Sequence, residues 1–121
     1  MKNSLKAIIL GTAIGLTSCT PSIYSFYGKI GDEKVFCWKN QLNLGEELNL
    51  SIIKKDGRTF SYKSEGMKLE SITIEEKESS ITYKNDEIGR EALQIAQKQF
   101  TDYLAKILET KKKQAIEDVS N

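Results

Sequence analysis

The sequence contains no histidine. Histidine is the commonest general base in enzymes and a principal ligand of zinc, so its absence excludes Ser-His-Asp and Cys-His mechanisms. A zinc site would depend on cysteine and carboxylate side chains, which lack suitable spacing here. No glycine-rich phosphate loop and no calcium-binding loop is present either. We therefore expect no catalytic, cofactor-binding or metal-binding residues.

A carboxylate pair or a Ser-Lys pair is the remaining catalytic option, although no motif recommends a particular pair. The clustered glutamates fall at expected turns and strand ends, where solvated side chains are usual. They are Glu46, Glu47, Glu75, Glu76 and Glu78.

The sequence also lacks an excess of charge of one sign, because 18 lysines and arginines are balanced by 17 acidic residues. A nucleic-acid binder needs basic residues gathered on one surface, whereas the lysines here are scattered among glutamates. We expect no nucleic-acid partner.

Long hydrophobic runs are missing as well. The apolar run from Ala7 to Leu16 is half the length that a helix needs to cross a hydrocarbon core of ~30 Å. Lys2 and Lys6 precede this run, and small polar residues follow it. This three-part layout is typical of a secretory signal.

The run ends in Leu16-Thr17-Ser18-Cys19, which resembles the lipobox of prokaryotic lipoproteins. The resemblance covers only the first 19 residues. It implies cleavage between Ser18 and Cys19 and a lipid anchor on the Cys19 thiol. An anchor with at least two acyl chains gives stable membrane residence. Since Thr20 rather than aspartate follows the cysteine, the resemblance implies an outer membrane facing the periplasm in a double-membraned bacterium, and otherwise the outer face of the cell membrane.

Lipidation of Cys19 would leave Cys37 without a disulfide partner. Cys37 stands in the apolar stretch 35–38, where a lone thiol is expected to be a small buried side chain. Cleavage would also remove two lysines, so the mature chain would carry 16 basic and 17 acidic residues.

We expect four segments in the chain. Residues 1–18 are a signal peptide, residues 19–23 a lipidated cysteine with a short tether, residues 24–114 one domain, and residues 115–121 a frayed tail. Within the domain, short β-rich runs alternate with turn signals, which predicts an antiparallel meander. The six strands are expected at about 24–30, 33–39, 47–55, 58–63, 68–75 and 80–84.

The turn at Gly31 and Asp32 predicts a first hairpin in which Tyr27 lies opposite Phe36, on the same face as Trp38. In the second hairpin, a two-residue loop at 56 and 57 would pair Ile53 with Phe60. That register puts apolar residues on both faces.

The third hairpin needs a loop at 76–79, which pairs Ile74 with Ile81 and Ile72 with Tyr83. After the capping residues at 85 and 86, apolar positions recur three and four apart, which predicts one helix from about Glu87 to Lys113. The expected apolar stripe of this helix is Leu93, Ala96, Phe100, Tyr103, Leu104 and Ile107.

The expected fold class is therefore α+β, with an antiparallel β-meander of about six strands, as a strongly curved sheet or partial barrel, packed by one long C-terminal helix. If the helix covers one face, the aromatic group Tyr27, Phe36 and Trp38 is left on the other. Closure of the core over these rings by barrel curvature is favoured, and a second protein or the membrane is the alternative cover.

The expected function is that of an exported, lipid-anchored envelope protein, a non-catalytic binding or structural module whose candidate interaction patch is Tyr27, Phe36 and Trp38. Its expected partners are the membrane, through lipid on Cys19, and another envelope protein. The alternatives are a small envelope enzyme with carboxylates or a Ser-Lys pair, and an inhibitor-type lipoprotein. Beyond residue 19 the chain resembles only small lipoproteins of unknown role, and its oligomeric state is left open.

Overall fold

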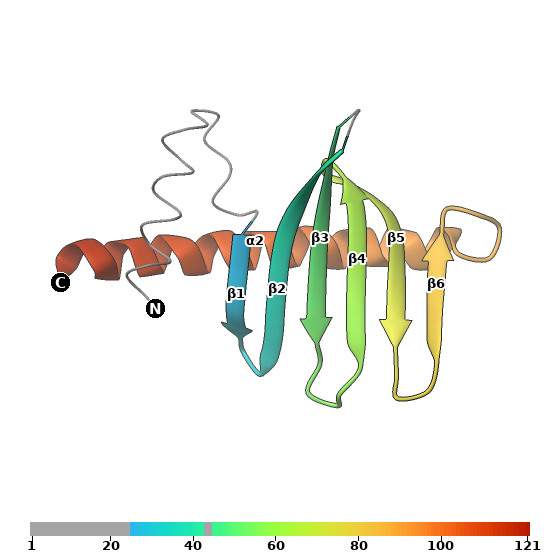
Figure 1. Cartoon of the computed structure of the whole chain (residues 1–121), viewed down its shortest axis with the longest axis horizontal. Coiled ribbons are helices and arrows are strands. Elements are labelled where there is room, and N and C mark those ends of the chain that lie inside the picture. Colours follow the sequence, from blue (N-terminus) through green and yellow to red (C-terminus); the bar gives the residue numbers. More distant parts are fainter. Residues whose placement is uncertain (1–24, 43–44) are drawn as a thin grey trace.

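The computed structural model describes residues 25–42 and 45–121. The predicted signal peptide, lipobox and tether lie outside the described residues. Six antiparallel strands pair in chain order and are followed by one helix (Figure 1). The elements are β1 (Ser25–Ile30), β2 (Glu33–Leu42), β3 (Gly45–Ile53), β4 (Thr59–Glu65), β5 (Lys68–Glu75), β6 (Ser80–Lys84) and α2 (Arg90–Ser120).

The α+β meander with one C-terminal helix is confirmed. In the described part of the chain β1 and β6 are the two edges of the sheet, so the sheet is open. The helix α2 crosses one face transversely to the strands (Figure 1). Its 31 residues extend for about 46 Å, whereas six strands span about 24 Å. The C-terminal turns of α2 therefore project beyond β1.

The hydrophobic core lies between α2 and the face of the sheet that it covers. The predicted helical stripe is buried in full, which confirms that it docks on the sheet. Alternate residues of the strands supply the other half of the core. The largest side chains with less than 2% exposure are Val35, Cys37, Leu50, Ile52, Tyr62, Phe100 and Ile107.

The first and third hairpins have the predicted register: Tyr27 lies opposite Phe36, and Ile74 lies opposite Ile81. The predicted register of the second hairpin is wrong by one residue. Ile52, not Ile53, lies opposite Phe60.

The loop of the second hairpin explains this shift. The Lys54 amide donates to the Arg58 carbonyl at 2.8 Å, and the Gly57 amide donates to the Lys54 carbonyl at 3.0 Å. Gly57 has φ +95°, so the loop has three residues and a left-handed glycine instead of the two-residue turn. The consequence is that Ile52 and Phe60 both face α2, and on the other face this hairpin carries a single apolar residue, Ile53, instead of the several that were expected there.

The helix begins three residues later and ends seven residues later than predicted. Residues 87–89 form a turn whose Gly89 amide donates to Asp86 Oδ1 at 2.8 Å. Gly89 has no room for a Cβ atom, which would lie 2.3 Å from the Lys84 carbonyl oxygen. The predicted frayed tail at 115–121 is instead helical through Ser120, in a segment without glycine or proline where Gln114 donates to Asp118 at 2.9 Å.

Candidate functional site

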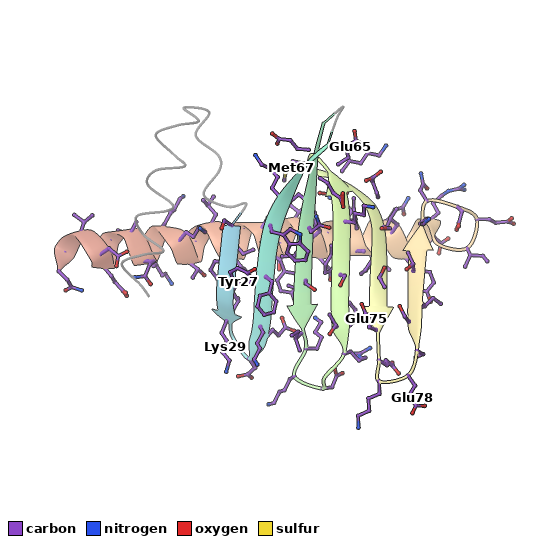
Figure 2. The ribbon with its side chains drawn as sticks, in the orientation of Figure 1. Tyr27, Lys29, Glu65, Met67, Glu75 and Glu78 are labelled. Atoms are coloured by element: carbon purple, nitrogen blue, oxygen red, sulfur yellow. The ribbon has the colours of Figure 1, made fainter. Side chains whose placement is uncertain are left out.

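The candidate site is the face of the sheet opposite α2, which we call the open face. Figure 2 views this face, with the labelled Tyr27 on β1 and with α2 behind the sheet. The structure brings the three predicted residues of the interaction patch together here. Tyr27 is 68% exposed and Trp38 is 40% exposed, while Phe36 is partly buried. The favoured closure of the core over these rings is wrong, because the sheet does not curl far enough to pair its edges.

The rings of Tyr27 and Phe36 make an edge-to-face contact, with centroids 5.3 Å apart and an interplanar angle of 70°. Such a contact is the favoured geometry of an aromatic pair and holds both rings in place. Together with Trp38 and Ser51 they line a shallow, wide-mouthed hollow of about 460 Å³. The hollow exposes apolar rings to solvent beside a hydroxyl group.

A row of hydroxyl side chains continues from this hollow across the sheet. Cross-strand pairing places Ser51 beside Phe36, Ser61 beside Ser51, and Thr73 beside Ser61. Thr82 on the edge strand β6 completes this hydroxyl row. The two serine oxygens lie 3.2 Å apart and the two threonine oxygens 2.8 Å apart, so each pair shares one hydrogen bond.

A second row of side chains crosses the open face beside the hydroxyl row. Trp38 on β2 lies opposite Asn49 on β3, and Asn49 lies opposite Lys63 on β4. The Lys63 ammonium forms an ion pair with Glu47 at 3.6 Å. The Asn49 Nδ2 group is buried and donates to no acceptor among the described residues. A buried amide donor without an acceptor is unusual in a folded protein.

Asn49 and Ser61 were not among the predicted site residues. The predicted register placed Ser51 opposite Tyr62, which hid the match between Ser51 and Ser61. Polar residues at 49 and 51, and again at 61 and 63, alternate with apolar residues along their strands. This pattern could have indicated that the two pairs share a polar face.

Charged side chains of both signs lie on the open face. Strand alternation and cross-strand pairing place five lysines and three glutamates on it. They are Lys29, Lys34, Lys63, Lys68, Lys84, Glu47, Glu65 and Glu75. The labelled Lys29, Glu65 and Glu75 lie near the strand ends in Figure 2, away from the centre of the face.

A different polar cluster joins the sheet to α2. The Lys54 ammonium donates to the Tyr103 hydroxyl at 3.0 Å and lies 3.1 Å from Glu33, which also accepts a short hydrogen bond from Tyr103. Partial burial alone would raise the pKa of Glu33, but the hydrogen bonds from Tyr103 and Lys54 lower it. The same contacts outweigh burial and raise the pKa of Lys54, so its amine stays protonated. These groups satisfy one another, and the cluster fixes the helix to the sheet.

Cys37 is 1% exposed, which confirms the expectation of a small buried side chain. Burial raises the pKa of its thiol from 9.0 to about 12. Since the thiolate is the reactive form, Cys37 is poorly suited to nucleophilic chemistry.

In a Cys19→Ala chain, where Cys37 is the only thiol, we expect alkylation at mildly alkaline pH to be at least ~100-fold slower in the folded protein than in concentrated urea. The reason is that both the thiolate fraction and access fall on burial. Mass spectrometry over time would measure the two rates. Equal rates would contradict the burial of Cys37.

The remaining chemistry of the described residues is limited. They contain no group of three Cys, Asp or Glu side chains that could hold a metal ion. They also include no helix with the length and apolar character required to cross a bilayer.

No protein-family model matches the chain, and the searches of curated proteins and of solved structures found no match either.

Proposed function

We propose that the protein is an exported lipoprotein that is anchored by lipid on Cys19 and binds a component of the cell envelope through its open face. The observation that carries the binding function is the exposed aromatic hollow of Tyr27, Phe36 and Trp38 on the side of the sheet opposite α2. Neighbouring aromatic rings of this kind are common at binding hot spots.

Binding fits the open face better than catalysis does. The hollow is lined by three aromatic side chains and Ser51. This lining includes no base and no charged group that could activate the serine. The hydrogen-bonded cluster of Glu33, Lys54 and Tyr103 joins the sheet to α2 and is not part of the hollow. The site thus offers contact area and hydrogen bonds.

The lipid anchor is supported by the lipobox at 16–19 after a basic start and a short apolar run. Ser25, where β1 begins, follows Cys19 by only six residues. Six residues reach about 20 Å when fully extended. An anchor at Cys19 would hold the domain close to the membrane surface, where envelope components are within reach.

Site-specific photocrosslinking in intact cells tests the binding function. A photoreactive phenylalanine analogue at Tyr27 is expected to give a crosslinked adduct on irradiation, because this ring is 68% exposed within the hollow. The same analogue at Ile95, which is 62% exposed on α2, is the matched control and is expected to give none. Gel mobility and mass spectrometry would detect the adduct.

The Trp38→Ala variant adds a second criterion. It is expected to abolish the adduct at position 27 while the domain stays folded, which circular dichroism would check, because Trp38 is 40% exposed and lies outside the buried core. Equal crosslinking at positions 27 and 95, or an adduct that survives Trp38→Ala, would refute binding at this face.

A further inference from the structure

The size of the aromatic hollow limits what the open face can bind. From their exposed fractions, the three rings present roughly 300 Å² of surface to solvent. A stable protein interface buries about 800 Å² on each partner and has an apolar centre. The central strands of the open face instead carry Ser51, Ser61 and Thr73 of the hydroxyl row. A small ligand with both apolar and hydroxyl surfaces matches this face better than a second protein does.

The charge of the open face further limits the class of ligand that it can bind. Five lysines and three glutamates leave an excess of two positive charges spread over six strands, Lys63 is already paired with Glu47, and Lys68 lies opposite Glu65. A surface for an anionic polymer would carry an excess of lysine and arginine. The balance favours an uncharged ligand.

The hydrogen-bonding groups of the face suit a polyhydroxylated ligand. Serine and threonine hydroxyls can both donate and accept, as sugar hydroxyls do, and their side chains are short enough to allow close approach. The Asn49 Nδ2 donor has no acceptor among the described residues and belongs to the residue directly opposite Trp38. Because this donor is buried, an acceptor oxygen of a ligand seated on Trp38 would pair with it once the Asn49 side chain turns toward that ligand, which would relieve the cost of leaving the donor unpaired.

We propose that the open face binds an uncharged, β-linked oligosaccharide whose sugar rings stack on Tyr27 and Trp38 and whose hydroxyls meet the hydroxyl row. Sugar rings with equatorial hydroxyls present apolar C–H groups on their flat faces and hydrogen-bonding groups around the rim. They therefore match aromatic rings bordered by hydroxyls and an amide. This inference rests on the proposed binding function of the same face and names its ligand class.

Trp38 is the only tryptophan in the chain, so its fluorescence reports on this site alone. The protein as isolated from its cells would be titrated with chitotetraose and with cellotetraose, two uncharged β-linked tetrasaccharides. A saturable change in Trp38 fluorescence is expected with chitotetraose, whose N-acetyl carbonyl can accept from Asn49, and a weaker response or none with cellotetraose. Tyr27→Ala is expected to weaken the affinity at least tenfold, and Ile95→Ala is expected to leave it unchanged.

Tyr27 is 68% exposed, so the variant is expected to fold, which circular dichroism would check. No fluorescence change with either sugar would overturn the oligosaccharide proposal. A blue shift with phosphatidylcholine or phosphatidylglycerol vesicles, without a response to sugar, would overturn it in favour of the membrane. If the photocrosslink at Tyr27 forms while both sugars fail, the ligand class is wrong and the binding function stands. If neither the photocrosslink nor a response to sugar is observed, the binding function and the oligosaccharide proposal are both refuted.

Discussion

Replacing Phe100 with alanine is expected to lower the free energy of unfolding by about 3 to 5 kcal/mol. Phe100 has no exposed surface and lies in the middle of the buried stripe of α2. Its ring packs 6.1 Å from the ring of Tyr62, so the truncation leaves a cavity between the helix and the sheet. A single domain commonly has only 5 to 15 kcal/mol of stability, so the expected loss is a large part of the total.

Urea denaturation followed by circular dichroism would measure this loss. Ile95→Ala is the matched control, because Ile95 is an apolar residue of the same helix that is 62% exposed, and its substitution is expected to cost less than about 1 kcal/mol. A loss at Phe100 no larger than that at Ile95 would mean that α2 does not hold the sheet through this stripe.

Cys19→Ala is expected to release the protein from the membrane fraction almost completely. The proposed anchor is a thioether on this sulfur, and alanine has no group that can form one. Each buried CH₂ of an acyl chain contributes about 0.8 kcal/mol to membrane binding, so removing two or more chains abolishes stable attachment. The described residues contain no membrane-spanning helix that could replace it.

Cell fractionation and incorporation of a clickable fatty acid would test this expectation. Cys37→Ala is the matched control, because it removes the other cysteine of the chain and is expected to leave both localisation and labelling intact. Fatty-acid labelling that persists in Cys19→Ala would refute the lipid anchor. That outcome would not bear on binding by the open face, which photocrosslinking tests separately.

The parts of the fold that depend on side-chain periodicity were predicted from the sequence. Five of the six strands begin within one residue of their expected start, because alternation and turn residues agree along most of this segment. The six apolar positions of α2 are all buried, since only a helical repeat places them on one face. The aromatic patch followed from the two-residue turn after Ile30, which sets the register of the first hairpin.

The local sequence does not determine other features of the fold, such as the register of the second hairpin. An Asp-Gly pair suits a two-residue turn and also a three-residue loop with a left-handed glycine. Burial decides between them, because only the longer loop puts Ile52 and Phe60 on the side that α2 covers. The same shift gathers Ser51 and Ser61 on the open face, so the hydroxyl row was missed.

The end of α2 was predicted too early because the buried stripe stops at Ile107. Backbone hydrogen bonds and good helix-forming residues carry the helix farther, beyond the last of its buried residues. Whether the sheet would close over Tyr27 and Trp38 depended on its overall curvature, which no single hairpin reveals.

Under the proposed export, the pairing of the strands in chain order has a consequence for how the chain would acquire its structure. A polypeptide that leaves a secretion channel from its N-terminus finds each new strand beside the one that has just emerged, and every hairpin closes a short loop. The helix leaves last. Until Phe100 and Ile107 have crossed, half of the hydrophobic core is missing. Translocation of the final quarter of the polypeptide therefore sets the moment at which the domain can become stable.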